Sequence, residues 1–304
     1  MSPPLVVLIA PTASGKSRLA ALAAAQAGAS VVNMDALQHY AGMAVGTAQP
    51  DSEETRLAPH LGYGWLDPAQ PFSVGQYLER FVPIVQAELA KGRGVVLVGG
   101  TGLYLNALLF GIADIPAIPE TVRRQVLDDL EREGSEATHR RLAQLDPETA
   151  RRLHPADRQR VGRALEVALA TGTPLSQWQQ ATHPPDLQLT VATLEIDRET
   201  LGRRSDRRLE AMWKGGLLEE ARTLLARALD PNLPAMKGLG YPHALAFLRG
   251  ELQEEEALAA AQLGTRQYIK RQETWIRGLI RKGVAFERLE GERGVAQLAG
   301  LLGG

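Results

Sequence analysis

The chain has 304 residues, 44% of them hydrophobic and 23% charged, which is enough for one sizeable core with an appended subdomain. Lysine plus arginine (34) nearly balances aspartate plus glutamate (35), so net charge predicts no polyanion partner, and a nucleic-acid surface must come from local clustering. The absence of cysteine excludes disulfides, thiolate chemistry and zinc sites with cysteine ligands.

The first predicted element is a strand at residues 5–10 (LVVLIA), a continuous apolar run typical of a strand buried on both faces of a parallel sheet. The run is much shorter than a secretory or membrane-spanning segment, and no other stretch approaches about 18 uninterrupted apolar residues. We therefore expect a soluble, cytoplasmic protein. After a turn rich in glycine, serine and threonine, residues 17–27 are predicted to form an alanine-rich helix.

Two further buried strands are predicted at residues 30–34 and 94–98. Between them, residues 73–91 carry apolar side chains at helical spacing, with Ser73 as a candidate N-cap. A later strand at residues 189–196 is expected to join the same sheet. Strands that alternate with helices imply right-handed βαβ units, so we predict an α/β fold with a doubly wound parallel sheet.

A segment rich in helix formers and without strand signals interrupts this alternation between two proline-containing breaks. Its predicted helices lie at residues 122–134, 137–145 and 158–171. We interpret residues 116–185 as a helical insertion domain within an α/β core made of residues 1–115 and 186–304. The C-terminal region of the core is predicted to be helical, with a long helix from about residue 254 to residue 282.

Residues 10–17 (APTASGKS) lie between the first strand and the first helix, where backbone N–H groups and the helix N-terminus can bind an anion. Lys16 supplies positive charge for phosphoryl oxygens and Ser17 supplies a hydroxyl for Mg²⁺. Ala10 replaces the glycine of the P-loop motif, which requires that this residue avoid positive φ. The predicted diphosphate-binding residues are Pro11, Thr12, Ala13, Ser14, Gly15, Lys16 and Ser17. The loop alone fits NTP kinases, GTPases and diphosphate-using transferases, and a turn without a ligand is the remaining alternative.

Polar residues also follow the next two strands, at the sheet edge where open α/β sheets bind ligands. Asp35 lies in the block NMDALQHY at residues 33–40, which is followed by GTAQP at residues 46–50. Thr101 lies in GGTGLY at residues 99–104. Taken alone, Asp35 has the alternative role of a helix cap, and the glycine-rich run has that of a tight turn.

Together these blocks resemble the bacterial tRNA dimethylallyltransferase family (tRNA isopentenyltransferase, or IPP transferase), whose pattern reads G-P-T-A-S-G-K-[ST], D-S-x-Q-x-Y, G-T-A-K-P and G-G-T-G-L-Y. The resemblance covers most of the chain, because it continues in DRQRVGRALEV (157–167), RSDRR (204–208), GLGY (238–241) and TRQYIKRQETW (265–275). The departures are Ala10 for glycine, Ala36 for serine and Gln49 for lysine. At position 36 only a backbone contact can be carried over, and position 49 is not carried over.

The resemblance implies a P-loop-type enzyme of the EC 2.5.1 class that uses Mg²⁺. It would transfer a dimethylallyl group from dimethylallyl diphosphate to N6 of adenine 37, next to the anticodon, in tRNAs reading codons that begin with U. Asp35 would accept the N6 proton, and Thr101 and Arg208 would assist departure of the diphosphate. Gln38 would bond the edge of the flipped base. The family also suggests a monomer without an obligate protein partner.

The implied tRNA-binding residues are Asp35, Ala36, Leu37, Gln38, Thr101, Arg123, Gln159, Arg160, Arg163, Arg266 and Lys270. The last two lie in residues 263–282, which hold six basic residues and one acidic residue. On a helix, Arg266, Lys270, Arg277 and Arg281 form one stripe, opposite Tyr268, Trp275 and Leu279 and flanked by Ile269, Ile276 and Ile280. We expect the basic stripe to lie along phosphates, with a merely solvated face as the alternative.

Three other functions remain open from the residues alone. A P-loop small-molecule kinase or NTPase would need neither the insertion nor the basic helix. A prenyltransferase acting on free adenine nucleotides would have a shorter C-terminal region without the motif at 265–275. A non-catalytic RNA-binding protein would not need Lys16, Asp35 and Thr101 together. The histidines show no metal-ligand spacing, and none is assigned to a metal.

Overall fold

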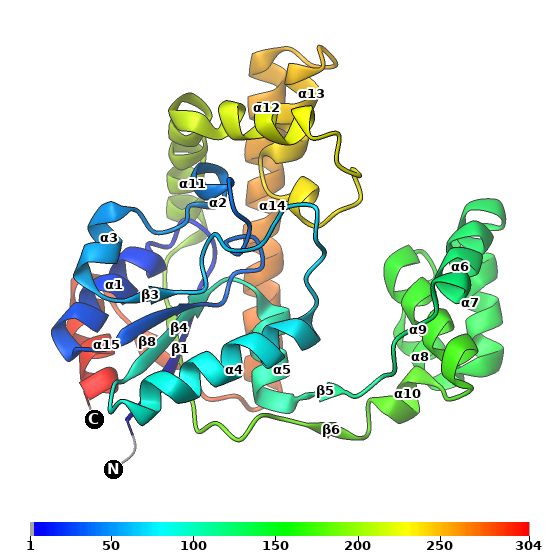
Figure 1. The fold of residues 1–304 in the computed structure, drawn as a ribbon, viewed down its shortest axis with the longest axis horizontal. Helices are drawn as coiled ribbons and strands as arrows, with labels where there is room; N and C mark the ends of the chain where they lie inside the picture. The colour runs from blue at the N-terminus through cyan, green and yellow to red at the C-terminus, as the bar shows by residue number, and fades with distance from the viewer. Residues whose placement is uncertain (1–2, 304) are drawn as a thin grey trace. The chain divides into compact units, whose positions relative to one another are not determined.

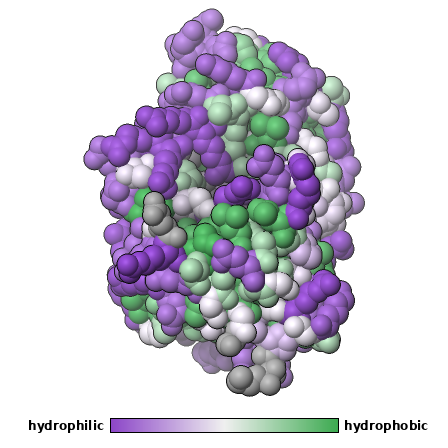
Figure 2. All heavy atoms as spheres, turned by 90° about the vertical axis from the view of Figure 1, so that its left-hand side faces the viewer, coloured by the Kyte–Doolittle hydropathy of each residue, from purple (hydrophilic) through white to green (hydrophobic). Residues whose placement is uncertain are grey.

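The computed structural model describes residues 3–303, which form two compact units. The first unit comprises the chain up to Asn106 and from Asp186 onward, and the second comprises Ala107–Pro185. No helix among these described residues is both long enough and apolar enough to cross a bilayer. Figure 2 shows one face of the molecule, on which hydrophilic residues surround a central strip of hydrophobic ones.

The first unit is built on a parallel sheet whose strand order, within residues 3–303, is β3-β2-β4-β1-β7-β8 (Figure 1). The strands are β1 (Leu5–Ile9), β2 (Ser30–Asn33), β3 (His60–Leu61), β4 (Val95–Gly99), β7 (Thr190–Leu194) and β8 (Glu287–Leu289). Every residue of β1, β2 and β4 is buried, as their apolar runs predict. The predicted doubly wound α/β fold is confirmed, with β3 and β8 as additional edge strands.

Helices connect the strands of this sheet along the chain, and one further helix follows its last strand (Figure 1). They are α1 (Lys16–Ala27), α3 (Ser52–Leu57), α4 (Val74–Ala90), α5 (Gly102–Phe110) and, after β8, α15 (Gly294–Gly303), whereas the short α2 (Ala44–Thr47) packs against the helical segments that follow β7. The predicted cap of α4 is confirmed, since the Ser73 side chain accepts a hydrogen bond from the backbone N–H of Gln76. Four of the six alanines of α1 are buried, and these small side chains let α1 pack closely against α15.

A second apolar core lies among the helices that follow β7. These are α11 (Arg198–Met212), α12 (Leu218–Ala226), α13 (Tyr241–Leu248) and α14 (Glu254–Arg281), with a π-helical turn (Trp213–Leu217) between α11 and α12. Their buried side chains, such as Leu209 and Tyr241, pack around Tyr40 and Met43 from the chain that follows β2. This core therefore anchors the loop after β2 against α11 and α14.

The second unit consists of helices α6 (Glu120–Arg132), α7 (Gly134–Leu145), α8 (Pro147–Arg152), α9 (Arg158–Thr171) and α10 (Leu175–Trp178), with the short antiparallel pair β5 (Ile112–Ala113) and β6 (Thr182–His183). Two small apolar clusters stabilise it, one around Leu142 and one around Leu165. Buried Asp146 accepts hydrogen bonds from the backbone N–H groups of Thr149 (3.0 Å) and Ser176 (2.9 Å). The predicted insertion began at residue 116, whereas this unit begins at Ala107 because it includes β5.

Candidate functional site

The carboxyl ends of β1, β2 and β4 bring the predicted polar loops together. Strand β4 lies between β2 and β1, with Gly99 opposite Ile9 and Val98 opposite Asn33. Thr101 connects two of the loops, because its Oγ1 accepts a hydrogen bond from the backbone N–H of Ala36 at 2.9 Å. The sequence blocks after the three strands therefore share one edge of the sheet.

Gln272 of α14 connects the third loop to this arrangement, and sequence reasoning assigned it no role. Its Oε1 accepts a hydrogen bond from the N–H of Thr12 (2.9 Å), and its Nε2 donates to the carbonyl of Gly100 (3.0 Å). A Cβ at Gly100 would lie 2.2 Å from that Nε2, so the close approach requires glycine. The sequence offered one signal for this residue, a glutamine that directly follows the basic pair Lys270 and Arg271. The helical projection of this region did not indicate whether position 272 is buried.

The P-loop has the backbone geometry of an anion site. Gly15 (φ 83°) precedes the first residue of α1, and Ala13 (φ 62°) is also left-handed. Ala10 is buried and is not among the described residues with positive φ, as its place in the motif requires. The Lys16 ammonium donates a long bond of 3.4 Å to the carbonyl of Pro11. Among the described residues, the Lys16 ammonium thus has no strong hydrogen-bond partner, whereas the Thr12 N–H of the loop already bonds Gln272.

Two cations and one carboxylate face each other beside the loop. Burial lowers the pKa of Lys16 to about 8; Asp35 acts in the opposite direction and Arg208 adds to the lowering. Burial also lowers the pKa of Arg208, and Asp35 and Glu54 partly offset that effect. Lys16, Asp35 and Arg208, which come from three separate elements, are therefore close enough to interact electrostatically.

Asp35 is held by its neighbours on the chain. Its Oδ1 accepts a hydrogen bond from the N–H of Leu37 at 3.0 Å, but no helix begins here, because the next helix, α2, starts at Ala44, so the alternative of a helix cap is wrong. Fully buried Asn33 accepts from the N–H of Asp35 (2.7 Å) through Oδ1 and donates to its carbonyl (3.2 Å) through Nδ2. This local bond uses one carboxylate oxygen and leaves the other available in the site.

The side chain of His39 contacts that of Asn33. The Asn33 amide nitrogen lies 3.0 Å from His39 Nδ1, and this ring nitrogen also lies 3.3 Å from the carbonyl oxygen of Gly62. Burial lowers the pKa of His39 to about 4, so the ring is neutral. Its neighbours are the aromatic rings of Trp65, Phe72, Tyr77, Phe81 and Tyr104.

Gln38, which was predicted to contact a base, is buried, and its amide nitrogen donates hydrogen bonds to the protein backbone. Nε2 donates to the carbonyls of Thr47 (3.0 Å) and Ala48 (2.7 Å). Both N–H groups of the amide are therefore engaged in holding the loop around α2. That loop is also held by Glu220, which accepts hydrogen bonds from the N–H groups of Val45 (2.7 Å) and Gly46 (2.9 Å).

Three hollows formed by described residues follow one another along this edge. The phosphate hollow, of about 260 Å³, is lined by Ala13, Gly15, Lys16, Ser17, Arg18, Ala48, Gln49, Asp51, Glu54 and Arg208. The central hollow, of about 70 Å³, is lined by Thr12, Ala13, Asp35, Leu37, Gly46, Thr47, Ser205, Arg208, Leu209, Met212, Leu239, Thr265, Tyr268 and Gln272. The outer hollow, of about 250 Å³, is lined by Ile9, Ala10, Gly100, Gly102, Leu103, Tyr268, Arg271, Gln272, Trp275 and Ile276. The phosphate and central hollows share the lining residues Ala13 and Arg208, and the central and outer hollows share Tyr268 and Gln272.

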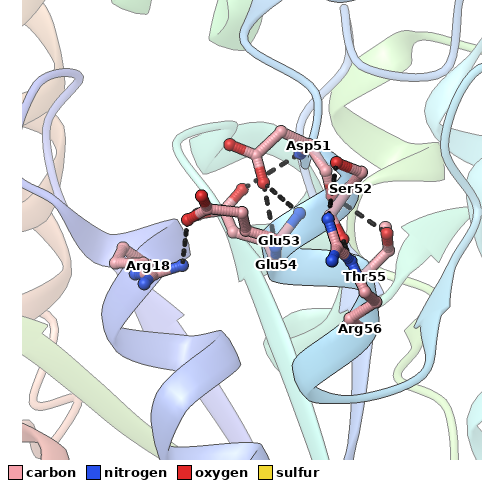
Figure 3. Close-up of polar contacts among 7 residues, drawn as sticks. All are labelled: Arg18, Asp51, Ser52, Glu53, Glu54, Thr55 and Arg56. Atoms are coloured by element: carbon pink, nitrogen blue, oxygen red, sulfur yellow. Dashed lines mark hydrogen bonds and ion pairs between the residues drawn. The ribbon is translucent and has the colours of Figure 1, made fainter.

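The N-terminal turn of α3 forms the acidic wall of the phosphate hollow (Figure 3). Asp51 caps the helix by accepting from the N–H groups of Glu53 (2.8 Å) and Glu54 (2.9 Å), and the bond from Glu54 lowers the pKa of Asp51. Glu53 forms an ion pair of 3.7 Å with Arg18 of α1. Carboxylate oxygens from α3 thus line the same hollow as the hydroxyl of Ser17.

The four residues of the predicted basic stripe on α14, Arg266, Lys270, Arg277 and Arg281, are all exposed. Arg266 is exposed but pairs with Asp206 of α11 at 2.7 Å, and Lys270 is exposed. Ile269 and Leu279 are buried, whereas Ile280 is 43% exposed. The predicted flank is therefore not uniformly buried along the helix.

The other predicted RNA contacts lie on exposed positions of the second unit, where each arginine has a nearby acid. Arg123 pairs with Glu120 at 3.8 Å. On α9, Arg160 pairs with Asp157 (3.5 Å), Arg163 pairs with Glu166 (3.3 Å), and Gln159 is exposed. Surface pairs of this kind are weak, so these side chains can exchange their partners for phosphates.

Comparison with known proteins gives consistent results. A family model described as IPP transferase matches residues 38–279. The tRNA dimethylallyltransferase of Phenylobacterium zucineum (strain HLK1) is 48% identical over 278 residues, 91% of each chain. That of Rhodopseudomonas palustris (strain ATCC BAA-98 / CGA009) is also 48% identical, over 90% of this chain and 87% of the relative.

Solved structures are similar over nearly the whole chain. The full-length tRNA isopentenylpyrophosphate transferase of Bacillus halodurans has a TM-score of 0.69 at 31% identity, covering 98% of this chain and 95% of that one. A eukaryotic dimethylallyltransferase described as acting on tRNA has a TM-score of 0.81 at 25% identity, covering 95% of this chain and 74% of the other.

Proposed function

The chain belongs to the IPP transferase family and is an enzyme that prenylates tRNA; we propose that it transfers a dimethylallyl group from dimethylallyl diphosphate to N6 of adenine. The adenine is number 37, beside the anticodon, in tRNAs reading codons that begin with U, and the products are N6-dimethylallyladenosine and diphosphate. The observation that supports the proposal is that a hollow at Lys16 and a small hollow lined by Asp35 share the walls formed by Ala13 and Arg208.

The diphosphate of the donor binds the P-loop, residues Pro11–Ser17. Its oxygens accept hydrogen bonds from the loop N–H groups and contact Lys16 and Arg208, the two cations that face each other in this hollow. Bringing an anion between these cations relieves their repulsion and favours the protonated form of Lys16. The donor is therefore anchored by its leaving group.

In the transfer step the bond between C1 of the allyl group and the diphosphate oxygen breaks, and the leaving diphosphate keeps the electron pair. A new bond forms between N6 and C1, and the N6 proton passes to the carboxylate of Asp35. Lys16, Arg208 and the loop amides stabilise the developing negative charge. Thr101 supports the same centre, because accepting from Ala36 leaves its own hydroxyl hydrogen able to donate.

Mg²⁺ is the proposed cofactor, and the oxygen ligands available in the phosphate hollow suit it. The Ser17 hydroxyl faces this hollow together with Asp51 and Glu54. Within residues 3–303 no group of three or more His, Cys, Asp or Glu side chains could hold a metal ion. Mg²⁺ would thus be held by Ser17 and the diphosphate oxygens, and would supply charge neutralisation of the leaving group.

The adenine, which must leave its stack to react, would enter through the outer hollow. Tyr268 and Trp275 offer flat apolar surfaces there, and the Arg271 guanidinium lies 5.6 Å from the Tyr268 ring. Asp35, Leu37 and Thr101 would contact the base from the site side, Ala36 through its backbone, and Gln38 through its amide oxygen. The surface residues Arg123, Gln159, Arg160, Arg163, Arg266 and Lys270 would contact the rest of the anticodon stem-loop. We further propose a cytoplasmic monomer without an obligate protein partner.

The decisive assay offers labelled dimethylallyl diphosphate and Mg²⁺ together with either unmodified tRNA or AMP. Label that appears in tRNA and not in AMP supports the proposal. Label in AMP would favour a prenyltransferase of free nucleotides, and phosphoryl transfer from ATP without prenylation would favour a kinase. Mapping the label to adenine 37 by nuclease digestion tests the position.

A further inference from the structure

The turn that follows β2 is held by side chains and not by helix or sheet bonds. The N–H of Asp35 donates to Asn33 Oδ1 at 2.7 Å, and the N–H of Leu37 donates to Asp35 Oδ1 at 3.0 Å. Between them, the N–H of Ala36 donates to Thr101 Oγ1 at 2.9 Å. Neither strand β2, which ends at Asn33, nor helix α2 includes residues 35–37. The conformation of Asp35 therefore depends on the side chains that bond this turn.

Asn33 bonds both polar groups of the Asp35 backbone. Besides accepting from the N–H, it donates from Nδ2 to the Asp35 carbonyl at 3.2 Å. Turning the amide over would set its NH2 group against the N–H of Asp35, so that two donors would face each other. A side-chain oxygen that bonds the N–H two residues on forms an Asx-turn. Asn33 thus fixes the backbone of Asp35, and with it the direction in which the carboxylate projects.

The Asn33 side chain is itself held in place. It is fully buried at the end of β2. Its Nδ2 lies 3.1 Å from the carbonyl oxygen of Gly62 and 3.0 Å from His39 Nδ1. The Tyr77 hydroxyl donates to the backbone carbonyl of Asn33 at 3.4 Å. Because packing and polar contacts fix the amide, it can hold its neighbour within a fraction of an ångström.

The carboxylate of Asp35 lines the central hollow, whereas Asn33 lines none of the three hollows described above. A general base has to lie within hydrogen-bond reach of the atom whose proton it accepts. A displacement of about 1 Å can lower a rate about 100-fold. A residue that fixes the backbone of Asp35 therefore affects the transfer step without touching either substrate.

We propose that Asn33 is a positioning residue for the transfer step: by bonding both backbone groups of Asp35, it holds the carboxylate where the carboxylate can accept the N6 proton. The inference rests on the proposed function, in which Asp35 is the base. Removing the Asn33 amide should slow transfer and leave the binding of donor and tRNA unchanged. A residue that only stabilised the fold would lower the melting temperature without lowering kcat.

The test measures kcat, KM for dimethylallyl diphosphate, tRNA affinity and melting temperature. Asn33→Ala should lower kcat about 10- to 100-fold and leave KM and tRNA affinity within about twofold of wild type. Asn33→Ser should recover most of the lost kcat, because a serine hydroxyl can accept from the same N–H two residues on. If Asn33→Ala does not fold, Asn33→Ser has to show the same pattern alone, a lower kcat with an unchanged KM.

Ser30→Ala is the matched control for stability. Ser30 is the first residue of β2, is fully buried, and donates to the Glu88 carboxylate at 2.6 Å. Its removal should lower the melting temperature and leave kcat unchanged. A double variant separates the two roles further: adding Asn33→Ala to Asp35→Ala should cause no additional loss in the single-turnover rate, because the group that Asn33 positions is already gone.

Three results would overturn the inference. They are equal kcat values for Asn33→Ala and Ser30→Ala, no recovery of kcat in Asn33→Ser, and a loss from Asn33→Ala that persists in full without the Asp35 carboxylate. Absence of transfer by the wild-type enzyme would instead refute the proposed function.

Discussion

Replacing Gln272 with leucine should uncouple the P-loop from the loop after β4. The change removes two hydrogen bonds, from Thr12 N–H at 2.9 Å and to the Gly100 carbonyl at 3.0 Å, at a side chain that is 7% exposed. Each such bond contributes about 0.5–1.5 kcal/mol net, so the loss should be about 1–3 kcal/mol. Because Thr12 belongs to the phosphate loop, part of this loss should appear as weaker donor binding.

The assay combines thermal unfolding with steady-state kinetics. For a unit of this size the loss corresponds to a melting temperature lower by about 2–4 °C per kcal/mol, and KM for dimethylallyl diphosphate should rise about tenfold. Gln267→Leu is the control, since it makes the same change at an exposed position of α14. If Gln272→Leu and Gln267→Leu have the same melting temperature and the same KM for dimethylallyl diphosphate, the connection through Gln272 is not functional.

Three other predictions concern the site and its surface. Asp35→Ala should lower the rate of transfer by about 10²- to 10⁴-fold with tRNA affinity preserved, measured by single-turnover kinetics and filter binding; loss of tRNA binding would make Asp35 a structural residue. Because the pKa of Lys16 in the free site is about 8, the charged fraction of its amine falls above that pH, so affinity for dimethylallyl diphosphate should weaken between pH 7 and 9. Calorimetry should show that this pH dependence of donor affinity is absent in Lys16→Arg, whose side chain stays charged. A wild-type affinity that does not change between pH 7 and 9 would contradict the prediction. Arg266→Ala combined with Lys270→Ala should weaken tRNA binding and reduce, by up to about 2, the slope of log binding constant against log salt concentration. An unchanged slope would mean that this face is only solvated and does not contact tRNA phosphates.

The elements with strong local signals could be predicted from the sequence. Strands β1, β2 and β4 are continuous β-branched runs, and α9 has the predicted bounds, Arg158–Thr171. Strands β3 and β8 have two and three residues and lie at the edges of the sheet, so they carry too little periodicity to recognise. Their pairing depends on the strand already present beside them.

The chemistry of the candidate site was also readable, because each block lies directly at the end of a strand. Parallel strands end at one edge, so Lys16, Asp35 and Thr101 were expected at the same edge, and the adjacency of β2, β4 and β1 brings them together. The hydrogen-bond partners of the side chains in these blocks could not be predicted from the sequence. Gln38 looked like a residue facing substrate, yet both its N–H groups bond the loop around α2.

The sequence by itself determined the fold class, the order of the phosphate loop and its companion motifs, and the resemblance to tRNA dimethylallyltransferases, since these follow from local periodicity and from residue types at fixed spacing. Only the tertiary structure decided that β4 lies between β1 and β2, that Gln272 reaches a loop 260 residues away in the chain, and that the Thr101 hydroxyl bonds the backbone N–H of Ala36. Burial and hydrogen-bond choice depend on segments distant in the chain, and no local pattern records which of them will pack together.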